Sequence, residues 1–205
     1  GGEMGVGGWI AALDLVSGRE IWRAFNTGPD ADVKVGARFR PFYPTERGAN
    51  LGVTSWPGDA WKIGGGAVWG WLSYDPALNL VYYGTSNPGP WNEKQRPGDN
   101  KWTCAIMARD ADTGELVWAF QVTPHDLWDY DTVNENILVD MPVKGNLRKV
   151  MVHFDRNGFA YTIDRATGEV LLAEPFVPMN WAKRIDLATG RPVVDTSKAT
   201  RQGVM

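Results

Sequence analysis

The chain has 205 residues, enough for one domain with a sizeable core, and its 22% charged and 43% hydrophobic residues are an ordinary globular composition. A net charge of −3 argues against a nucleic-acid or anionic-membrane partner. One cysteine and two histidines cannot build a disulfide within the chain or a Cys/His zinc site, so we expect any metal to be a hard ion on oxygen ligands. The most apolar stretch, residues 63–74, is interrupted by glycines and is shorter than the roughly 20 residues of a membrane-spanning helix.

One turn motif, Asp-x-x-Ser/Thr-Gly, occurs four times along the chain. Its copies begin at Asp14, Asp110, Asp164 and Asp186. Each copy predicts a β-hairpin, because the aspartate accepts hydrogen bonds from backbone N–H groups of a tight turn and the glycine adopts a left-handed conformation.

Two of these copies also share a small residue and a large one. Ala12 precedes Trp22 by ten residues, and Ala108 precedes Trp118 by the same distance, whereas the third copy has Leu172 at the tryptophan position. A small residue on one strand and an indole on the next allow four-stranded sheets to dock as the blades of a propeller do. We therefore expect Trp22 and Trp118 to pack between blades.

The segments between these hairpins are uneven in length. A long insert over residues 29–66 is followed by a further predicted hairpin around Asp75 and by a proline-containing insert over residues 87–101. Inserts on one face of a propeller are where sites are built. The predicted fold class is all-β: a β-propeller of four-stranded antiparallel blades, to which residues 1–205 contribute about three to four blades as part of one domain. Because the chain starts without methionine, we expect it to be an internal fragment of a longer protein.

A series of short motifs is distributed along the chain from residue 1 to residue 158. They lie at residues 1–3, 58–66, 69–71, 86–92, 96–102, 123–126, 128–131 and 155–158. In this order they resemble the large subunit of quinoprotein methanol dehydrogenases. That resemblance implies an eight-bladed propeller that binds pyrroloquinoline quinone (PQQ) and a metal ion on its axis.

The resemblance also implies a set of site residues. The metal ligands it implies are Glu3, Asn87, Asp129 and Asp131, with Asp129 also the catalytic base. The residues it places against PQQ are Gly1, Gly2, Ala67, Trp69 and Arg156, with Trp69 stacking on the quinone and Arg156 bonding its reactive carbonyl. Two positions depart from the family: Ala67 replaces a frequent threonine and Leu127 a usual glutamate.

The residue types fit that chemistry. Carboxylate and amide oxygens are the donors that Ca²⁺ or a larger trivalent ion prefers. Asp129 and Asp131 are two residues apart, so in an extended segment both side chains lie on one face and Tyr130 on the other. Within the family, an aspartate at the position of Asp131 is typical of the lanthanide-dependent type, and we therefore expect a lanthanide, with Ca²⁺ as the alternative.

The function implied is the oxidation of methanol or another small primary alcohol, with Asp129 as general base and hydride transfer to PQQ. The family's electron acceptor is a periplasmic cytochrome c, which implies a periplasmic enzyme, and we expect a homodimer. Two alternatives remain open: a non-catalytic propeller that serves as an envelope scaffold, and a quinoprotein dehydrogenase for larger alcohols. We expect the isolated chain to be inactive, because missing blades leave sheet edges unpaired.

Overall fold

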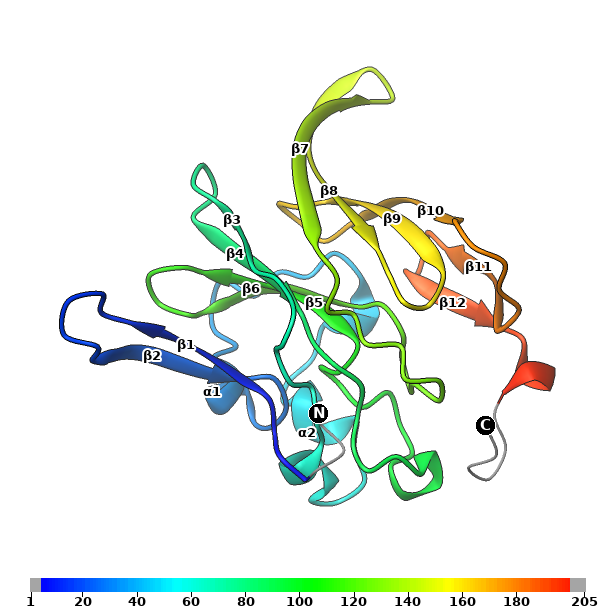
Figure 1. Ribbon diagram of the computed structural model, residues 1–205, viewed down its shortest axis with the longest axis horizontal. Coiled ribbons are helices and arrows are strands. Elements are labelled where there is room, and N and C mark those ends of the chain that lie inside the picture. The colour runs from blue at the N-terminus through cyan, green and yellow to red at the C-terminus, as the bar shows by residue number, and fades with distance from the viewer. Residues whose placement is uncertain (1–4, 200–205) are drawn as a thin grey trace.

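The structure is a computed structural model and describes residues 5–199 (Figure 1). Strands dominate it. They are β1 (Trp9–Leu13), β2 (Glu20–Phe25), β3 (Ser73–Asp75), β4 (Leu80–Gly84), β5 (Ala105–Asp110), β6 (Leu116–Gln121), β7 (Asn136–Val143), β8 (Asn146–Phe154), β9 (Phe159–Asp164), β10 (Val170–Pro175), β11 (Ala182–Asp186) and β12 (Arg191–Val194). The helices are short: α1 (Asp30–Val33), α2 (Leu51–Thr54) and the 3₁₀ turns Pro44–Glu46, Ala60–Ile63, Glu93–Gln95 and Thr196–Lys198.

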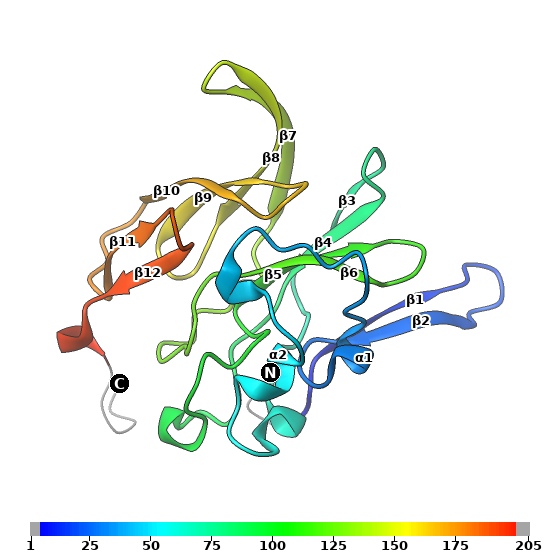
Figure 2. The same ribbon diagram turned by 180° about the vertical axis from the view of Figure 1, so that it is seen from behind.

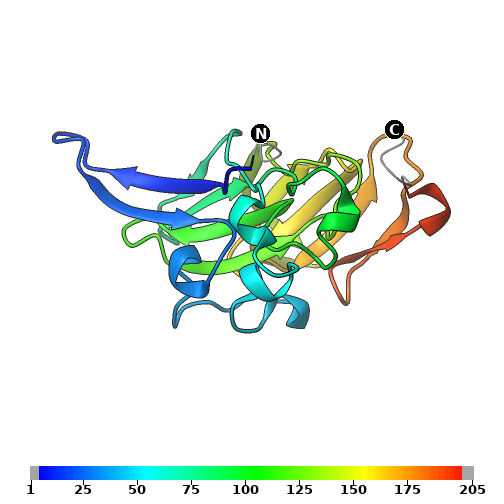
Figure 3. The same cartoon turned by 90° about the horizontal axis from the view of Figure 1, so that it is seen from below.

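The strands form four antiparallel sheets that follow one another in chain order. Two sheets are complete, with the orders β3-β4-β5-β6 and β7-β8-β9-β10, and β1-β2 and β11-β12 form one two-stranded sheet each. Figure 3 shows the sheets side by side across the molecule, with the insert that carries α1 and α2 below them. The β7–β8 hairpin extends beyond the other strands in both opposite views (Figures 1 and 2). The predicted propeller of four-stranded blades is therefore confirmed, with two complete blades flanked by two pairs of strands.

The hairpin predicted around Asp75 is present and starts the blade that the Asp110 hairpin completes. It joins β3 to β4, and β4 pairs with β5, so this hairpin and the Asp110 hairpin form one blade. The pairing was not readable from the sequence because the insert over residues 87–101 lies between β4 and β5.

The four repeated turns have the predicted chemistry. In the second copy, Asp110 Oδ1 accepts the N–H groups of Asp112 at 3.1 Å and Thr113 at 2.9 Å, and Gly114 is left-handed with φ +71°. The third copy repeats these contacts around Asp164, whose Oδ1 accepts two backbone N–H groups of its turn. The residues of each turn thus supply the hydrogen-bond acceptor and the left-handed glycine that its hairpin requires.

Both predicted tryptophans pack against the turn of the following blade. The indole of Trp22 donates to the carbonyl of Ala111 at 3.0 Å and covers Gly114, where a Cβ would lie 2.5 Å from the ring. The indole of Trp118 donates to the carbonyl of Arg165 at 3.1 Å and covers Gly168 in the same way. Both indoles are buried, as predicted.

Tyr43 takes the place of the tryptophan that the third copy lacks. Its ring covers Gly190, and its hydroxyl donates to the carbonyl of Leu187 at 3.3 Å and accepts the N–H of Val170 at 3.0 Å. Leu187 directly follows its turn aspartate, as the other two acceptors follow theirs. Burial raises the pKa of Tyr43 to about 12. An insert residue thus supplies the contact between blades that Leu172, which is partly exposed, does not make.

Replacing Tyr43 by phenylalanine should lower the free energy of unfolding by about 1–3 kcal/mol, because two backbone groups lose their shared partner while the ring still covers Gly190. Urea denaturation of the full-length protein, followed by tryptophan fluorescence, measures this change. The control is Tyr74→Phe, which removes an exposed hydroxyl that bonds Asn79. Equal effects of the two substitutions would show that the Tyr43 hydroxyl does not hold the blades together.

The two inserts are joined to each other beneath the sheets. Lys101 Nζ lies 2.8 Å from Glu46 Oε2, and both side chains are buried. Burial raises the pKa of Glu46 against the opposing effect of the Lys101 charge. This pair fixes the insert over residues 87–101, which begins at the candidate site residue Asn87. Within residues 5–199, no helix is long and apolar enough to cross a membrane.

Candidate active site

The predicted site residues lie on loops at one end of the strands. Asn87 follows β4, Asp129 and Asp131 follow β6, and Arg156 follows β8. Successive strands of these antiparallel sheets alternate in direction, so β4, β6 and β8 all run toward the end that carries these loops. The topology therefore brings together residues that are up to 69 positions apart in the chain, from Asn87 to Arg156.

A buried carboxylate shapes the loop that carries the two aspartates. Asp126 Oδ1 accepts the N–H groups of Trp128 at 3.1 Å and Tyr130 at 3.2 Å, and Oδ2 accepts the N–H of Asp129 at 3.1 Å. Burial raises the pKa of Asp126 to about 6, although these three N–H groups act in the opposite direction. The loop turns tightly around this side chain, and Asp129 adopts a left-handed conformation with φ +67°.

Arg156 brings the two aspartates together. Its Nη1 donates to Asp131 Oδ2 at 2.6 Å, and its Nη2 lies 3.5 Å from Asp129 Oδ2. The Asp131 side chain is 7% exposed, whereas Asp129 and Arg156 are 38% and 42% exposed. Asp131 is thus the buried member of the group, and the side chains of Asp129 and Arg156 are accessible to solvent.

The two aspartates share a side, as predicted, but the predicted extended backbone is wrong. Asp129 is left-handed because three N–H groups turn inward onto Asp126. Tyr130 points away from the acidic group and packs on the rings of Trp128 and Trp181, with centroids 5.5 and 5.6 Å distant. The turn thus places both aspartate side chains on one side, as an extended segment would have done, but with a different backbone conformation.

Asn87 is held directly against this group. Its backbone N–H donates to Asp131 Oδ1 at 2.7 Å, and its Nδ2 donates to the carbonyl of Pro88 at 3.4 Å. The residue is buried. An amide and two carboxylates therefore lie on two loops that Asp131 connects, and these hard oxygen donors fit a cation such as Ca²⁺ or a trivalent lanthanide.

The segment with Ala67 and Trp69 runs beside these loops. The N–H of Ala67 donates to Ser86 Oγ at 2.8 Å, and its carbonyl accepts the N–H of Ser86 at 2.9 Å, which places Ala67 beside Asn87. Gly70 approaches the aspartate loop so closely that a Cβ would lie 1.8 Å from the carbonyl oxygen of Val133. Trp69 is 59% exposed, unlike the tryptophans that dock blades, so its indole is available as a flat apolar surface for a planar ring.

The remaining predicted residues, Gly1, Gly2 and Glu3, lie outside the described residues. Within residues 5–199, no group of three His, Cys, Asp or Glu side chains is arranged around a possible ion position. The metal-ligand set therefore stays a prediction, although its donor types fit.

Sequence reasoning missed Asp126. The signal was present, because Asp126 stands three residues before Asp129, the spacing that the repeated turns use between their aspartate and Ser or Thr. In those turns the same spacing closes a hydrogen bond from the third N–H to the aspartate.

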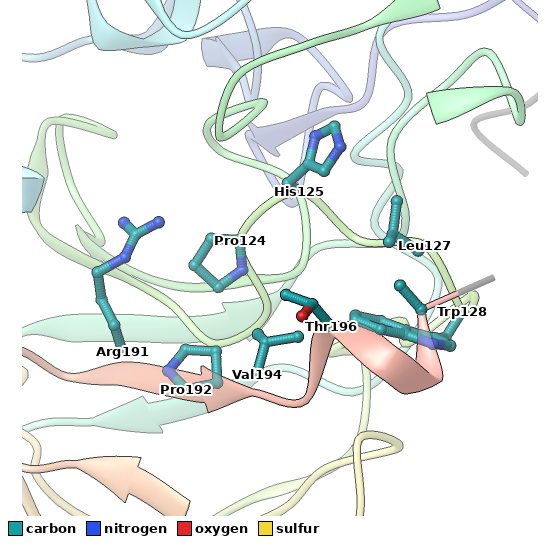
Figure 4. A pocket seen from close by; sticks show the side chains of 9 residues that line it. Pro124, His125, Leu127, Trp128, Arg191, Pro192, Val194 and Thr196 are labelled. Atoms are coloured by element: carbon teal, nitrogen blue, oxygen red, sulfur yellow. The ribbon is translucent and has the colours of Figure 1, made fainter. Parts of the chain in front are cut away.

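A separate cavity of about 300 Å³ lies on another side of this loop (Figure 4). Its lining is mainly apolar and comes from the aspartate loop and from the β12 segment. The lining residues are Pro124, His125, Leu127, Trp128, Arg191, Pro192, Val194, Thr196 and Ala199. Neither Asp129 nor Arg156 lines it. Leu127, where the family usually has glutamate, is one of the lining residues, and its aliphatic side chain fits the mainly apolar lining.

Comparison with known proteins shows the family of the chain. The family model described as the glucose/ethanol/alcohol dehydrogenase β-propeller domain (PQQ) matches residues 5–203. A lanthanide-dependent methanol dehydrogenase from Methylacidiphilum fumariolicum (strain SolV) is 54% identical over 205 residues, which cover 100% of this chain and 34% of that protein. Methanol dehydrogenase [cytochrome c] subunit 1 from Paracoccus denitrificans is 50% identical, with coverage of 98% of this chain and 32% of the relative.

The fold has a matching solved structure. A europium-containing methanol dehydrogenase superposes with a TM-score of 0.96 at 54% identity, over 100% of this chain and 36% of that chain. The chain thus spans about a third of the length of the relatives it matches. Because the family model covers almost all of the sequence, the chain belongs to the PQQ glucose/ethanol/alcohol dehydrogenase β-propeller family.

Proposed function

We propose that the protein to which this chain belongs oxidises methanol or another small primary alcohol to the aldehyde, with PQQ and a lanthanide ion as cofactors. The observation that carries this proposal is the convergence of Asn87, Asp129, Asp131 and Arg156 at one edge of the sheets. It occurs in a chain 54% identical to a protein named lanthanide-dependent methanol dehydrogenase. A scaffold propeller has no use for such a buried acidic group beside an exposed guanidinium.

The cofactors would be held by the residues already described. Asn87, Asp129 and Asp131 would supply oxygen donors to the metal together with Glu3, while Ala67, Trp69 and Arg156 would contact PQQ together with Gly1 and Gly2. When bound, PQQ supplies a hydride acceptor and the metal ion a Lewis acid.

Asp129 and Arg156 have separate tasks in the chemistry. The accessible carboxylate of Asp129 takes the hydroxyl proton of the alcohol as general base. The Arg156 guanidinium, 3.5 Å from Asp129 Oδ2, keeps that carboxylate oriented. Its remaining donors stabilise negative charge that develops on an oxygen nearby. Asp131 holds Arg156 and the Asn87 backbone at a fixed separation.

The wider setting belongs to the same proposal. A relative named methanol dehydrogenase [cytochrome c] subunit 1 supports a cytochrome c as electron acceptor. We propose a periplasmic location and a homodimeric enzyme on the same family grounds, and Ca²⁺ as the alternative metal.

The test is dye-linked alcohol oxidation by the full-length protein. The full-length protein is needed because β1-β2 and β11-β12 have two strands where the inner blades have four. The protein is reconstituted with PQQ and either La³⁺ or Ca²⁺, and supplied with primary alcohols of increasing length. Turnover of methanol with La³⁺ is the expected result. Activity confined to longer alcohols would favour the dehydrogenase for larger alcohols, and failure both to bind PQQ and to oxidise any alcohol would favour the scaffold.

A further inference from the structure

We propose that Asp126 is a positioning residue that sets the orientation of Asp129 through the hydrogen bond from the Asp129 N–H to Asp126 Oδ2. This inference rests on the proposed function, because it assigns a purpose to the placement of the candidate base. Asp126 would touch neither substrate nor cofactor, and it would act only through the backbone of the loop.

The geometry singles out this carboxylate. Its two oxygens accept hydrogen bonds from three consecutive backbone N–H groups, those of Trp128, Asp129 and Tyr130. The side chain is almost fully buried, so water cannot replace these contacts at low cost. In an extended loop these three N–H groups would not all point toward one side chain. Because all three bond Asp126, residues 126–130 fold around its carboxylate.

The backbone of Asp129 depends on that hydrogen bond. A left-handed conformation is uncommon for a residue other than glycine and costs conformational free energy. A buried acceptor that binds the Asp129 N–H offsets this cost. Because φ of Asp129 sets the direction of its Cα–Cβ bond, the same contact determines that the carboxylate lies 3.5 Å from Arg156.

Asp126 is itself fixed by the neighbouring insert. Its carbonyl accepts Nη2 of Arg96 at 2.6 Å, while Nη1 of Arg96 donates to Asn100 and Nε to the carbonyl of Pro90. Arg96 is buried. Asp126 is therefore, with Asp131, one of the residues that connect the insert beginning at Asn87 to the loop of Asp129. Its main-chain carbonyl contacts the insert, and its side chain shapes the loop.

The substitution Asp126→Asn tests the hydrogen bond from the Asp129 N–H to Asp126 Oδ2. The carboxamide oxygen can still accept the N–H groups of Trp128 and Tyr130, but its NH₂ then faces the N–H of Asp129, donor against donor. The matched control is Asp164→Asn, since Asp164 is also a buried aspartate that caps a turn, far from the site and paired with Arg148. Both substitutions should lower the thermal midpoint similarly.

Three measurements on the full-length protein then separate the outcomes. In Asp126→Asn we expect kcat for methanol to fall by at least about 10-fold with a smaller change in KM, since a displaced base slows the proton transfer. We expect Tb³⁺ affinity, measured by luminescence excited through tryptophan, to fall by about 10-fold. Amide hydrogen exchange should be faster over residues 127–131. Asp164→Asn should change none of the three.

The proposal is overturned if Asp126→Asn keeps the wild-type kcat, Tb³⁺ affinity and exchange rates while its thermal midpoint falls as in Asp164→Asn. Asp126 would then be a structural cap alone. If the wild-type protein neither oxidises alcohols nor binds Tb³⁺, the proposed function fails on its own. Hydrogen exchange still decides about Asp126 in that case: faster exchange over residues 127–131 supports its positioning of the loop, and unchanged exchange contradicts it.

Discussion

Replacing Asp129 by asparagine in the full-length protein should lower kcat for methanol between about 10²- and 10⁴-fold, the usual contribution of a general base. A carboxamide has the shape of the carboxylate but does not take the proton of an alcohol. Asparagine also tolerates the left-handed backbone that Asp129 adopts, so the loop should keep its course. Dye-linked kinetics at saturating methanol measure the effect.

Two controls show whether this loss reflects the base. Asp186→Asn changes a turn aspartate remote from the site and should leave kcat unchanged. Bound PQQ, measured by its absorbance, should remain near one per chain in Asp129→Asn. If the variant retained more than about a tenth of the wild-type kcat, another group would have to accept the proton.

The features that local turn chemistry determines could be predicted from the sequence. Each Asp-x-x-Ser/Thr-Gly motif carries its own hydrogen-bond acceptors and its own left-handed glycine, and all four hairpins formed where expected. The docking of Trp22 and Trp118 was also predictable, because Ala12 and Ala108 lie directly across the strand pair from them. The repeated motif contains both sides of this contact, since each indole covers the glycine of the next copy.

Features that depend on distant segments could not be predicted in this way. Tyr43 binds the N–H of Val170, 127 residues later in the chain, and no spacing connects an insert residue with a missing tryptophan. The left-handed Asp129 has a similar origin, because an extended segment was the natural expectation for Asp-Tyr-Asp until the burial of Asp126 became known. In both cases a buried hydrogen-bonding group overrides the local preference of the backbone.

The candidate site has features that could be predicted from the sequence and features that could not. The motif resemblance identified Asn87, Asp129, Asp131 and Arg156, and the structure brings these four together. Their mutual contacts were not foreseeable. In particular, the bond from the Asn87 N–H to Asp131 makes Asp131 a link between loops as well as a candidate ligand, and this double role bears on the choice of metal.

Asp131→Ala should weaken binding of La³⁺ by about 10²-fold and binding of Ca²⁺ by about 20-fold, because the Coulomb energy lost with one negative ligand is half as large again for a trivalent ion at the same distance. Lanthanide-supported activity should fall accordingly, while the smaller calcium-supported activity changes less. Displacement of Tb³⁺ from the full-length protein by La³⁺ or Ca²⁺ gives the two affinities, and dye-linked methanol oxidation gives the two activities.

The structure requires a second variant here, since Asp131 also accepts hydrogen bonds from Asn87 and Arg156. Asp131→Asn removes the charge but keeps one oxygen acceptor and the size of the side chain. If charge determines the preference for lanthanides, the asparagine variant should lose that preference as the alanine variant does. If it instead retains the La³⁺ affinity of the wild type, the contribution of Asp131 is to hold Asn87 and Arg156 in place. The preference for a trivalent ion would then have to come from other ligands.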